Sequence, residues 1–397
     1  MHKIKLLTKG LVASVAFMLP LMSFGQNCPT GQDCDKLRAI TTAVPILTVA
    51  PDARSAAMGD AGVAISPDAN APHWNPAKLG FMQNDISISA SYSPWLRNIV
   101  NDMSMSYVAF NKKLNETSSF SASLLYFNLG SIQLTDANGL PLQDFRPKEY
   151  TIDLAYGQKL SDYLSLGLGA RFIHSNLSSG VTVGSGPNAS TAKAGNSVAA
   201  DLGIYYSRDL IMGGKNYNLA LGGNLSNLGA KIGYTTPEEK DFIPTNLRLG
   251  TAFTMELDPY NKITLALDGN KLLVPSPQLD TTANRLARQK NILNAVVTSF
   301  SDAPDGFSEE IKEINLSVGA EYWYDNLFAA RVGYFYEDPD KGNRQYFSMG
   351  LGLRYQKFGI DAAYLIPNDQ NNPLAQTIRF SLHFNLEPEE STIVPAQ

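Results

Sequence analysis

From about residue 86 to the end of the chain, apolar side chains alternate with small or polar ones in segment after segment. In residues 164–172, LSLGLGARF, every even-numbered position is apolar and every odd-numbered one is small or charged. Residues 378–386, IRFSLHFNL, repeat the pattern. Successive side chains of a strand point to opposite faces, so each segment predicts a strand with one apolar and one polar face.

Alternation alone fits both a soluble β-sandwich and a membrane β-barrel, so the number and length of the strands must decide. The pattern predicts fourteen strands, at about 86–96, 102–110, 118–130, 149–160, 164–177, 197–209, 217–229, 245–256, 261–272, 315–326, 327–338, 346–356, 358–368 and 377–386. Most of these exceed the mean soluble strand and match the roughly 9 to 11 tilted residues that cross a bilayer. We therefore expect an all-β fold, a transmembrane antiparallel β-barrel over residues 86–386.

The connections between these strands alternate in length. Those after odd-numbered strands include 131–148, 178–196, 230–244 and 273–314, whereas those after even-numbered strands are as short as 161–163, 325–326 and 356–357. Long loops outside the cell and short turns inside are typical of outer-membrane barrels, and a sandwich has no reason to keep such parity.

Composition and the N-terminus support the same location. Charged residues make up 17% of the chain, below the roughly 25% of soluble domains. Residues 1–25 combine a short basic start with an apolar run that ends in small residues, which predicts a secretory signal peptide. A net charge of −5 without a basic tract argues against a nucleic-acid partner. We expect a multi-pass protein of the cell outer membrane.

Cys28 and Cys34 are the only cysteines and follow the signal peptide closely. In an oxidising compartment this spacing favours a small disulfide loop over a metal site. The tail, residues 387–397, carries Glu387, Glu389 and Glu390, and its sequence leaves open an ordered contact or a solvated end.

Residues 26–85 do not alternate and are rich in Ala, Pro, Asp and Gly. Such a segment cannot span lipid, because Pro removes backbone donors and irregular turns leave polar groups unpaired. It would form either a disordered leader or a plug inside the barrel. Its small side chains, which allow close backbone contact, and Trp74 favour the plug.

This segment also carries a family resemblance. The residues that carry it are Arg54, Ala57, Met58, Gly59, Asp60 and Gly62, followed by Trp74, Asn75, Pro76 and Ala77. The two runs resemble the hatch signature of FadL-like outer-membrane proteins, and in particular the PorV (LptO) branch of the type IX secretion system. The resemblance extends from the signal peptide through the hatch to the fourteen strands.

The resemblance implies a fourteen-stranded barrel plugged by its N-terminal segment, without enzymatic activity or cofactor. PorV-like members collect secreted cargo, recognised through its C-terminal signal domain, from the outer-membrane translocon. They deliver it to a sortase-containing attachment complex on the cell surface. Membrane lipid and lipopolysaccharide would surround such a barrel.

Two other functions remain as alternatives. FadL-like proteins in general transport fatty acids or other hydrophobic molecules across the outer membrane, and an apolar pocket beside the hatch would favour that function. A lipid-modifying enzyme would need a serine, a histidine and a carboxylate close together. The chain has no G-x-S-x-G motif and its four histidines are scattered, so neither an enzyme nor a metal site is expected.

The 273–314 loop contains the clearest surface feature. Leu286, Leu293, Val296, Val297 and Phe300 fall on one face of an expected helix, and Arg285, Arg288 and Lys290 lie near its start. The helix would either cap the barrel mouth or dock a partner protein or anionic lipid.

Two further expectations concern the lumen. Glycines at the polar phase of their strands, Gly167, Gly169, Gly350 and Gly352, are interpreted as gaps where the plug approaches the wall. His383 occupies a polar-phase position and is expected to face the lumen.

Overall fold

The computed structural model describes residues 38–95, 102–135, 141–177, 180, 182–183, 190–235, 240–278, 280–368 and 377–387. In this part of the chain, fourteen antiparallel strands close into one barrel, and each strand pairs with its sequence neighbours in the barrel order. They are β1 (Ile86–Pro94), β2 (Met103–Asn115), β3 (Ser118–Leu129), β6 (Lys148–Lys159), β7 (Leu164–Asn176), β10 (Gly195–Met212), β11 (Lys215–Gly229), β14 (Asn246–Asp258), β15 (Asn261–Leu272), β16 (Ile314–Tyr324), β17 (Phe328–Tyr336), β18 (Gln345–Tyr355), β19 (Phe358–Pro367) and β20 (Ile378–Leu386). The first strand closes the barrel by pairing with the last, from Ile86 opposite Leu386 to Tyr92 opposite Phe380. The prediction of a fourteen-stranded barrel is confirmed.

The two faces of the wall are the reverse of those of a soluble protein. On β7, Leu166, Leu168 and Phe172 point outward and are 38–60% exposed, whereas Ser165 and Arg171 face the lumen and are at most 6% exposed. A continuous apolar exterior of this kind is a surface for lipid. The two-residue alternation in the sequence is therefore the alternation between lipid and lumen.

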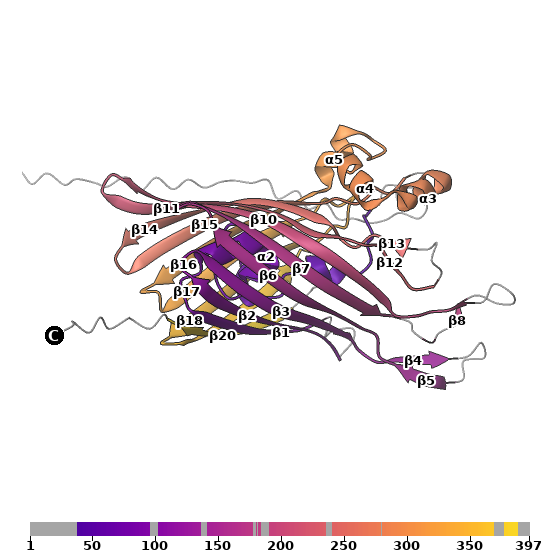
Figure 1. The fold of residues 1–397 in the computed structure, drawn as a ribbon, viewed down its shortest axis with the longest axis horizontal. Helices are drawn as coiled ribbons and strands as arrows, with labels where there is room; N and C mark the ends of the chain where they lie inside the picture. Colours follow the sequence, from indigo (N-terminus) through magenta and orange to yellow (C-terminus); the bar gives the residue numbers. More distant parts are fainter. Residues whose placement is uncertain are drawn as a thin grey trace, which may run out of the picture. The chain divides into compact units, whose positions relative to one another are not determined.

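Tight turns join the strands at one end of the barrel. Gly213 and Gly214, both with positive φ, connect Met212 to its partner Lys215, as hairpins of two residues require. The opposite end carries the long connections, with the hairpins β4–β5 (Ile132–Thr135, Pro141–Phe145), β8–β9 (Thr182–Val183, Ser190–Thr191) and β12–β13 (Ile232–Gly233, Lys240–Asp241). It also carries the helices α3 (Thr281–Gln289), α4 (Ile292–Thr298) and α5 (Phe307–Lys312) (Figure 1). We call these the short-turn end and the long-loop end.

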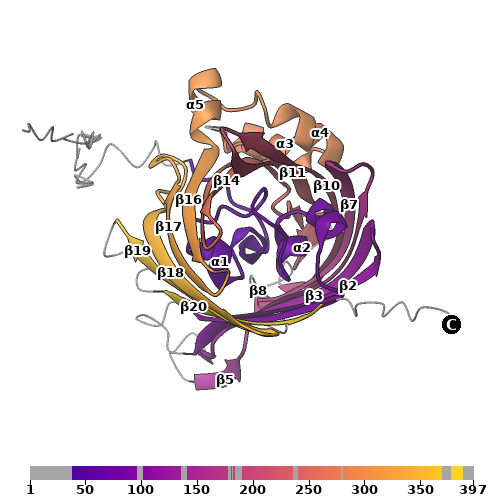
Figure 2. The ribbon, with the colours of Figure 1, turned by 90° about the vertical axis from the view of Figure 1, so that its left-hand side faces the viewer.

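Residues 38–85, which we call the plug, begin beside α5 at the long-loop end, where Arg38 pairs with Glu309, and their helices lie inside the ring of strands (Figure 2). The plug contains four short helices: η2 (Pro45–Thr48), α1 (Ala53–Ala56), α2 (Ala71–Trp74) and η3 (Pro76–Phe81). Local capping explains two of them, since the Asp52 side chain accepts the backbone N–H of Ser55, and Asn75 accepts that of Ala77 with Pro76 in the first helical position.

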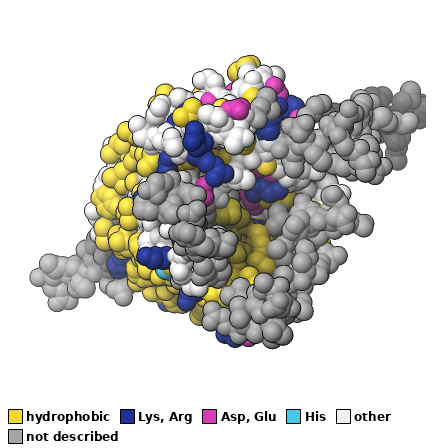
Figure 3. Space-filling model, turned by 90° about the vertical axis from the view of Figure 1, so that its right-hand side faces the viewer, with side chains coloured by type: hydrophobic (Ala, Val, Ile, Leu, Met, Phe, Trp, Pro, Cys, Tyr) yellow, Lys and Arg dark blue, Asp and Glu magenta, His cyan; other side chains and the backbone are white. Residues whose placement is uncertain are grey.

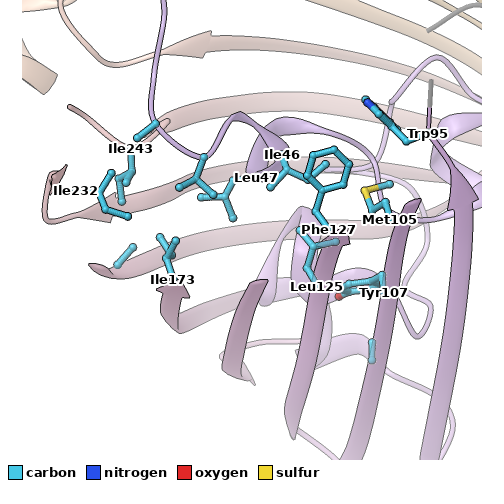
Figure 4. Packing of buried hydrophobic residues seen from close by; sticks show 14 residues of the cluster. Ile46, Leu47, Trp95, Met105, Tyr107, Leu125, Phe127, Ile173, Ile232 and Ile243 are labelled. Atoms are coloured by element: carbon cyan, nitrogen blue, oxygen red, sulfur yellow. The ribbon is translucent and has the colours of Figure 1, made fainter. Parts of the chain in front are cut away.

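The plug packs against the wall through an apolar cluster near the long-loop end. Ile46 and Leu47 lie among Trp95, which follows β1, Met105 of β2 and Phe127 of β3 (Figure 4). Each of these side chains is at most 9% exposed. Burial of this size fixes the plug in the barrel. No helix in the described residues is both long and apolar enough to cross a bilayer.

Candidate functional site

Arg54, at the start of the expected hatch motif, ties the plug to the barrel wall. Its Nε and Nη2 donate to Glu321 on β16 at 2.9 and 2.8 Å, and its Nη1 donates to Asp68 of the plug at 3.0 Å. Glu321 also accepts from Arg331 on β17 at 2.6 Å. Arg54, Glu321 and Arg331 are each more than nine-tenths buried, so the bridge between plug and wall is shielded from water.

The same chain of charges continues along the wall. Arg331 donates to Asp361 on β19 at 2.8 Å, and Asp361 in turn bonds His383 at 2.7 Å and Arg354 at 2.6 Å. We call these linked residues the ion network: Asp68, Arg54, Glu321, Arg331, Asp361, Arg354 and His383. The lumen position expected for His383 is confirmed, and its partner is a structural carboxylate.

Three other residues of the motif region bind the wall through hydrogen bonds. The backbone N–H of Gly62 donates to Asp268 on β15 at 2.7 Å. Asn75 Nδ2 donates to the carbonyl of Ile204 on β10 at 2.9 Å, and the carbonyl of Ala77 accepts from Ser165 on β7 at 2.6 Å. Inside the plug, Trp74 Nε1 donates to Asp52 at 2.7 Å.

Next to the strands that hold Arg54, the plug turns sharply at two residues with positive φ, Gly59 and Asp60. Gly59 N donates to Ser348 Oγ at 2.9 Å, and Asp60 accepts from the Tyr346 hydroxyl at 2.7 Å. Burial raises the pKa of Asp60, although Arg379, Tyr346 and Arg248 favour its carboxylate.

Glycines of the wall make this fit close. A Cβ atom at any of several wall glycines would come within 3.0 Å of a plug atom: Gly157, Gly167, Gly203, Gly222, Gly319, Gly333 and Gly350. Gly333 meets Met58 and Gly59, and Gly350 meets Ala57. The expected gaps are confirmed at Gly167 and Gly350. The prediction of plug contact is wrong at Gly169 and Gly352. Gly169 leaves room for Asp201 of the wall, and Gly352 for the Arg331–Asp361 pair.

Toward the long-loop end, plug and wall together line a cavity of about 570 Å³, which we call the outer cavity. Its walls include the aromatic residues Trp74, Trp95, Phe127, Phe335 and Tyr346. Arg248, Arg344 and Arg379 also line it, together with Asp60. Figure 3 looks onto this end and shows hydrophobic side chains inside a hollow bordered by charged ones. A concave, mostly apolar site with a few polar groups is typical of ligand binding.

The sequence did not single out the outer cavity, because its residues come from the plug and seven different strands. Only their polar or aromatic character at strand ends was visible in the sequence. Trp74 and Asp60 were predicted as hatch residues, and the structure shows that they also form part of the cavity floor.

The 273–313 segment, which we call the cap, corrects the expectation of one long helix. It forms α3 and α4, which are separated at Lys290 and Asn291, and the Asn291 side chain caps α4 by accepting the N–H of Asn294. The cap packs inward through small residues, since Ala295 clusters with Phe242 and Val274.

The larger residues of the expected docking face point to solvent. Leu286 is 57%, Leu293 69% and Val297 72% exposed, whereas Val296 is half-buried. Arg285 is exposed, Arg288 pairs with Asp241 at 3.3 Å, and Lys290 pairs with Asp302 at 3.1 Å. Arg288 therefore pairs the cap with the β12–β13 hairpin, whereas Lys290 pairs within the cap.

Buried charges join α5 to the barrel rim. Lys271 at the end of β15 donates to Glu310 at 2.9 Å and to Glu313 at 2.5 Å. Lys341 donates to Glu313 at 2.9 Å and to Glu309 at 2.6 Å. Burial raises the pKa of Glu313, but hydrogen bonds from Lys271, Ser276 and Lys341 outweigh it and hold the pKa below its ordinary value.

Other expectations fall on residues outside the described part of the chain. These are the signal peptide at 1–25, the Cys28–Cys34 disulfide and residues 388–397 of the tail.

The fold and the site define a class of protein: an outer-membrane β-barrel with an internal plug. Solved structures of similar fold include a TodX monoaromatic hydrocarbon channel variant, with a TM-score of 0.50 at 12% identity over 84% of this chain and 99% of that one. The Ralstonia pickettii toluene transporter TbuX gives 0.47 at 13% identity over 85% and 98%. A Pseudomonas aeruginosa FadL homologue gives 0.42 at 11% identity over 88% and 100%. A comparison with curated proteins gives no match.

The family follows from the sequence. The family described as Type IX secretion system protein PorV matches residues 32–279, which is more than half of the chain and includes the plug and the first nine barrel strands up to β15. The chain belongs to the PorV family and lies in the outer membrane.

Proposed function

We propose that this protein is a non-enzymatic carrier of the type IX secretion system. It binds exported cargo through the cargo's C-terminal signal domain, receives it from the outer-membrane translocon and delivers it to the sortase-containing attachment complex at the cell surface. Family membership supports the system in which it works. The plug supports a carrier, because hydrogen bonds join it to several strands of the wall and hold it inside the barrel.

The long-loop end offers the surfaces that a carrier needs. In outer-membrane barrels this end faces the cell exterior. It presents the outer cavity and the exposed apolar residues of the cap, among them Leu293, Val297 and Phe307, which is 77% exposed. We propose that the cap contributes to the docking of a partner protein.

Two histidines of the wall have structural partners. His174 Nδ1 bonds Asn196 at 2.7 Å and its ring stacks on Tyr150. His383 is held by Asp361. In the described part of the chain, no hydrogen bond joins a histidine to a serine that it would activate.

Affinity purification tests the proposal. The tagged full chain is isolated from the native membrane in mild detergent, and all bound proteins are identified. Secreted proteins with C-terminal signal domains and subunits of the translocon or attachment complex are expected. An unrelated outer-membrane barrel, purified in the same way, is the control. Recovery of none of these proteins above the control would contradict the carrier function.

A second candidate function is transport of a fatty acid or another hydrophobic molecule. The observation that favours it is the aromatic outer cavity lined by plug and wall. This function predicts that lipid extracts of the purified protein contain a stoichiometric apolar ligand. It also predicts that cells lacking the protein take up labelled oleate more slowly. Normal uptake together with an empty extract would exclude it.

A further inference from the structure

Two arginines of the outer cavity lack an ion-pair partner. Arg248 and Arg379 are 5% and 1% exposed. In the described residues, no carboxylate lies within ion-pair distance of either. Arg248 reaches only the carbonyl of Thr48 at 3.5 Å, and Arg379 donates to the carbonyl of Ala50 at 2.5 Å while its Nε has no partner.

Other lumen arginines have carboxylate partners. Arg54 and Arg331 share Glu321, and Arg171 pairs with Asp201 at 3.1 Å and with Asp153. Burying a charge without a counter-charge costs several kcal/mol in general, so buried charges are normally paired. The two unpaired arginines therefore suit a negatively charged group bound in the cavity.

The charge balance of the cavity indicates how much negative charge it accepts. Arg344 is paired through its Nε and Nη2 with Glu337, both at 2.8 Å. The remaining carboxylate, Asp60, lies in the field of all three arginines. Three arginines against two carboxylates leave one positive charge, which matches a single anionic group.

The rest of the lining indicates what carries that group. The guanidinium of Arg248 lies 4.8 Å from the ring centre of Trp74, and that of Arg379 lies 6.0 Å from Trp95. Phe127 and Phe335 complete the apolar wall. A carboxylate can accept hydrogen bonds from the two guanidinium groups, and an apolar group attached to the carboxylate suits the aromatic wall.

We propose that the outer cavity receives the C-terminal carboxylate of a secreted polypeptide, with Arg248 and Arg379 as its ligands and the aromatic wall as the site for the last side chains. This inference rests on the proposed carrier function and names the part of the cargo that is recognised. Capture of a chain end by fixed donors is a known mode of peptide recognition.

An adjoining cavity favours a polypeptide over a fatty acid. It has a volume of about 280 Å³ and shares Thr48, Leu272 and Asn315 with the outer cavity. Its other walls include Thr41, Thr42, Glu337 and Lys341. Glu337 is already bonded to Arg344, and Lys341 to Glu309 and Glu313, so the hydroxyl groups of Thr41 and Thr42 are the ones that suit the amides of a main chain entering from outside.

A pair of peptides tests the proposal on the unaltered protein. The probes are the last twelve residues of a secreted protein that co-purifies with the chain, made with a free carboxylate and with a carboxamide. Fluorescence polarisation with the detergent-purified full chain measures both affinities. Loss of the charge is expected to weaken binding about 10- to 100-fold. Equal affinities would overturn the proposal.

Variants assign the ligands. Arg248→Gln and Arg379→Gln should each weaken binding of the free acid about tenfold or more and leave the weak carboxamide binding unchanged. Arg208→Gln is the matched control, since Arg208 is an exposed arginine near the short-turn end that stacks on Tyr163. Sodium laurate is the competing probe. Laurate binding that depends on both arginines, without peptide binding, would overturn the assignment to a polypeptide.

Whole cargo separates this inference from the function on which it rests. Extending the cargo by a short Gly-Ser tail displaces its carboxylate and should reduce capture by the full chain. Undiminished capture of the extended cargo would overturn the inference and leave the carrier function standing. Failure to capture the unextended cargo would count against the carrier function itself.

Discussion

The short-turn half of the lumen and the long-loop half differ in how their charged groups are paired and in how closely the wall meets the plug. Around the plug, the charged groups of the ion network are paired, and glycines bring the wall against the plug backbone. At the long-loop end, plug and wall residues line the outer cavity, and in the described residues no carboxylate lies within ion-pair distance of its two buried arginines, Arg248 and Arg379.

This difference indicates that one half of the lumen holds the plug in place and that the other half is suited to bind a ligand. Satisfied charges and tight packing fix one arrangement, because any movement of the plug would expose unpaired groups. An unfilled cavity with unpaired charge costs stability and is retained where a ligand supplies what is missing. The inner half therefore serves as a fixed floor, and the outer half is the part available to partners.

The strongest way to break this comparison is to unbalance the ion network. Glu321→Gln leaves Arg54 and Arg331 without their shared carboxylate, and removing one side of a buried ion pair costs about 3–5 kcal/mol. The midpoint of urea unfolding in detergent should fall accordingly. Lys112→Gln is the control, because its pair with Asp85 is about 40% exposed on both sides and should contribute less than about 1 kcal/mol. Equal losses in the two variants would mean that the network does not fix the plug.

Filling one of the wall gaps should have the next largest effect. Gly333→Val places a side chain against the backbone of Met58 and Gly59, and overpacking of this kind costs about 1–3 kcal/mol. Gly269→Val is the matched control, since a Cβ there meets only Ile314 and Leu316, both at 3.9 Å. Heat-modified mobility on gels gives both stabilities. A loss at Gly269 as large as that at Gly333 would refute close plug contact as the cause.

The wall was predictable from the sequence because its signal is local and repeats every two residues. The phase of that repeat places Leu168 on lipid and His383 in the lumen without knowledge of the rest of the barrel. The short turn at residues 356–357 follows from the same reasoning, because it joins two strands whose registers are fixed by their apolar faces.

The pairings inside the lumen were not predictable in this way. Arg54 and Glu321 lie 267 residues apart, and their meeting depends on the registers of the intervening strands. The break between α3 and α4 was also missed. The apolar spacing of residues 286–300 fits one helix, but Asn291 starts a new one by capping it. The candidate binding surfaces at the long-loop end could therefore be located only from the structure.

The attachment of the cap should respond to acid. The pKa of Glu313 is below its ordinary value of 4.5, so its ion pairs contribute stability above about pH 4.5 and lose it as the pH falls through the folded-state pKa. Amide protection of residues 307–313, measured by hydrogen exchange and corrected for intrinsic rates, should stay level from pH 7 to 5 and fall below pH 4.5. Glu313→Gln should lower protection at pH 7, on the order of 1 kcal/mol, and flatten the pH profile. A wild-type profile that is flat down to pH 3 would contradict this account of the cap.

The exposed residues of the cap should matter least to stability. Leu293 and Val297 are 69% and 72% exposed, so the double change to Asn should alter the free energy of unfolding by less than about 0.5 kcal/mol. If the cap docks a partner protein, the same variant should recover less of that partner in affinity purification, because the apolar contact area is lost. Asn294→Ser, on the same helix and also exposed, is the control and should change neither quantity. Unchanged recovery would assign the cap to covering the barrel rim alone, and the outer cavity would then be the remaining candidate surface for cargo.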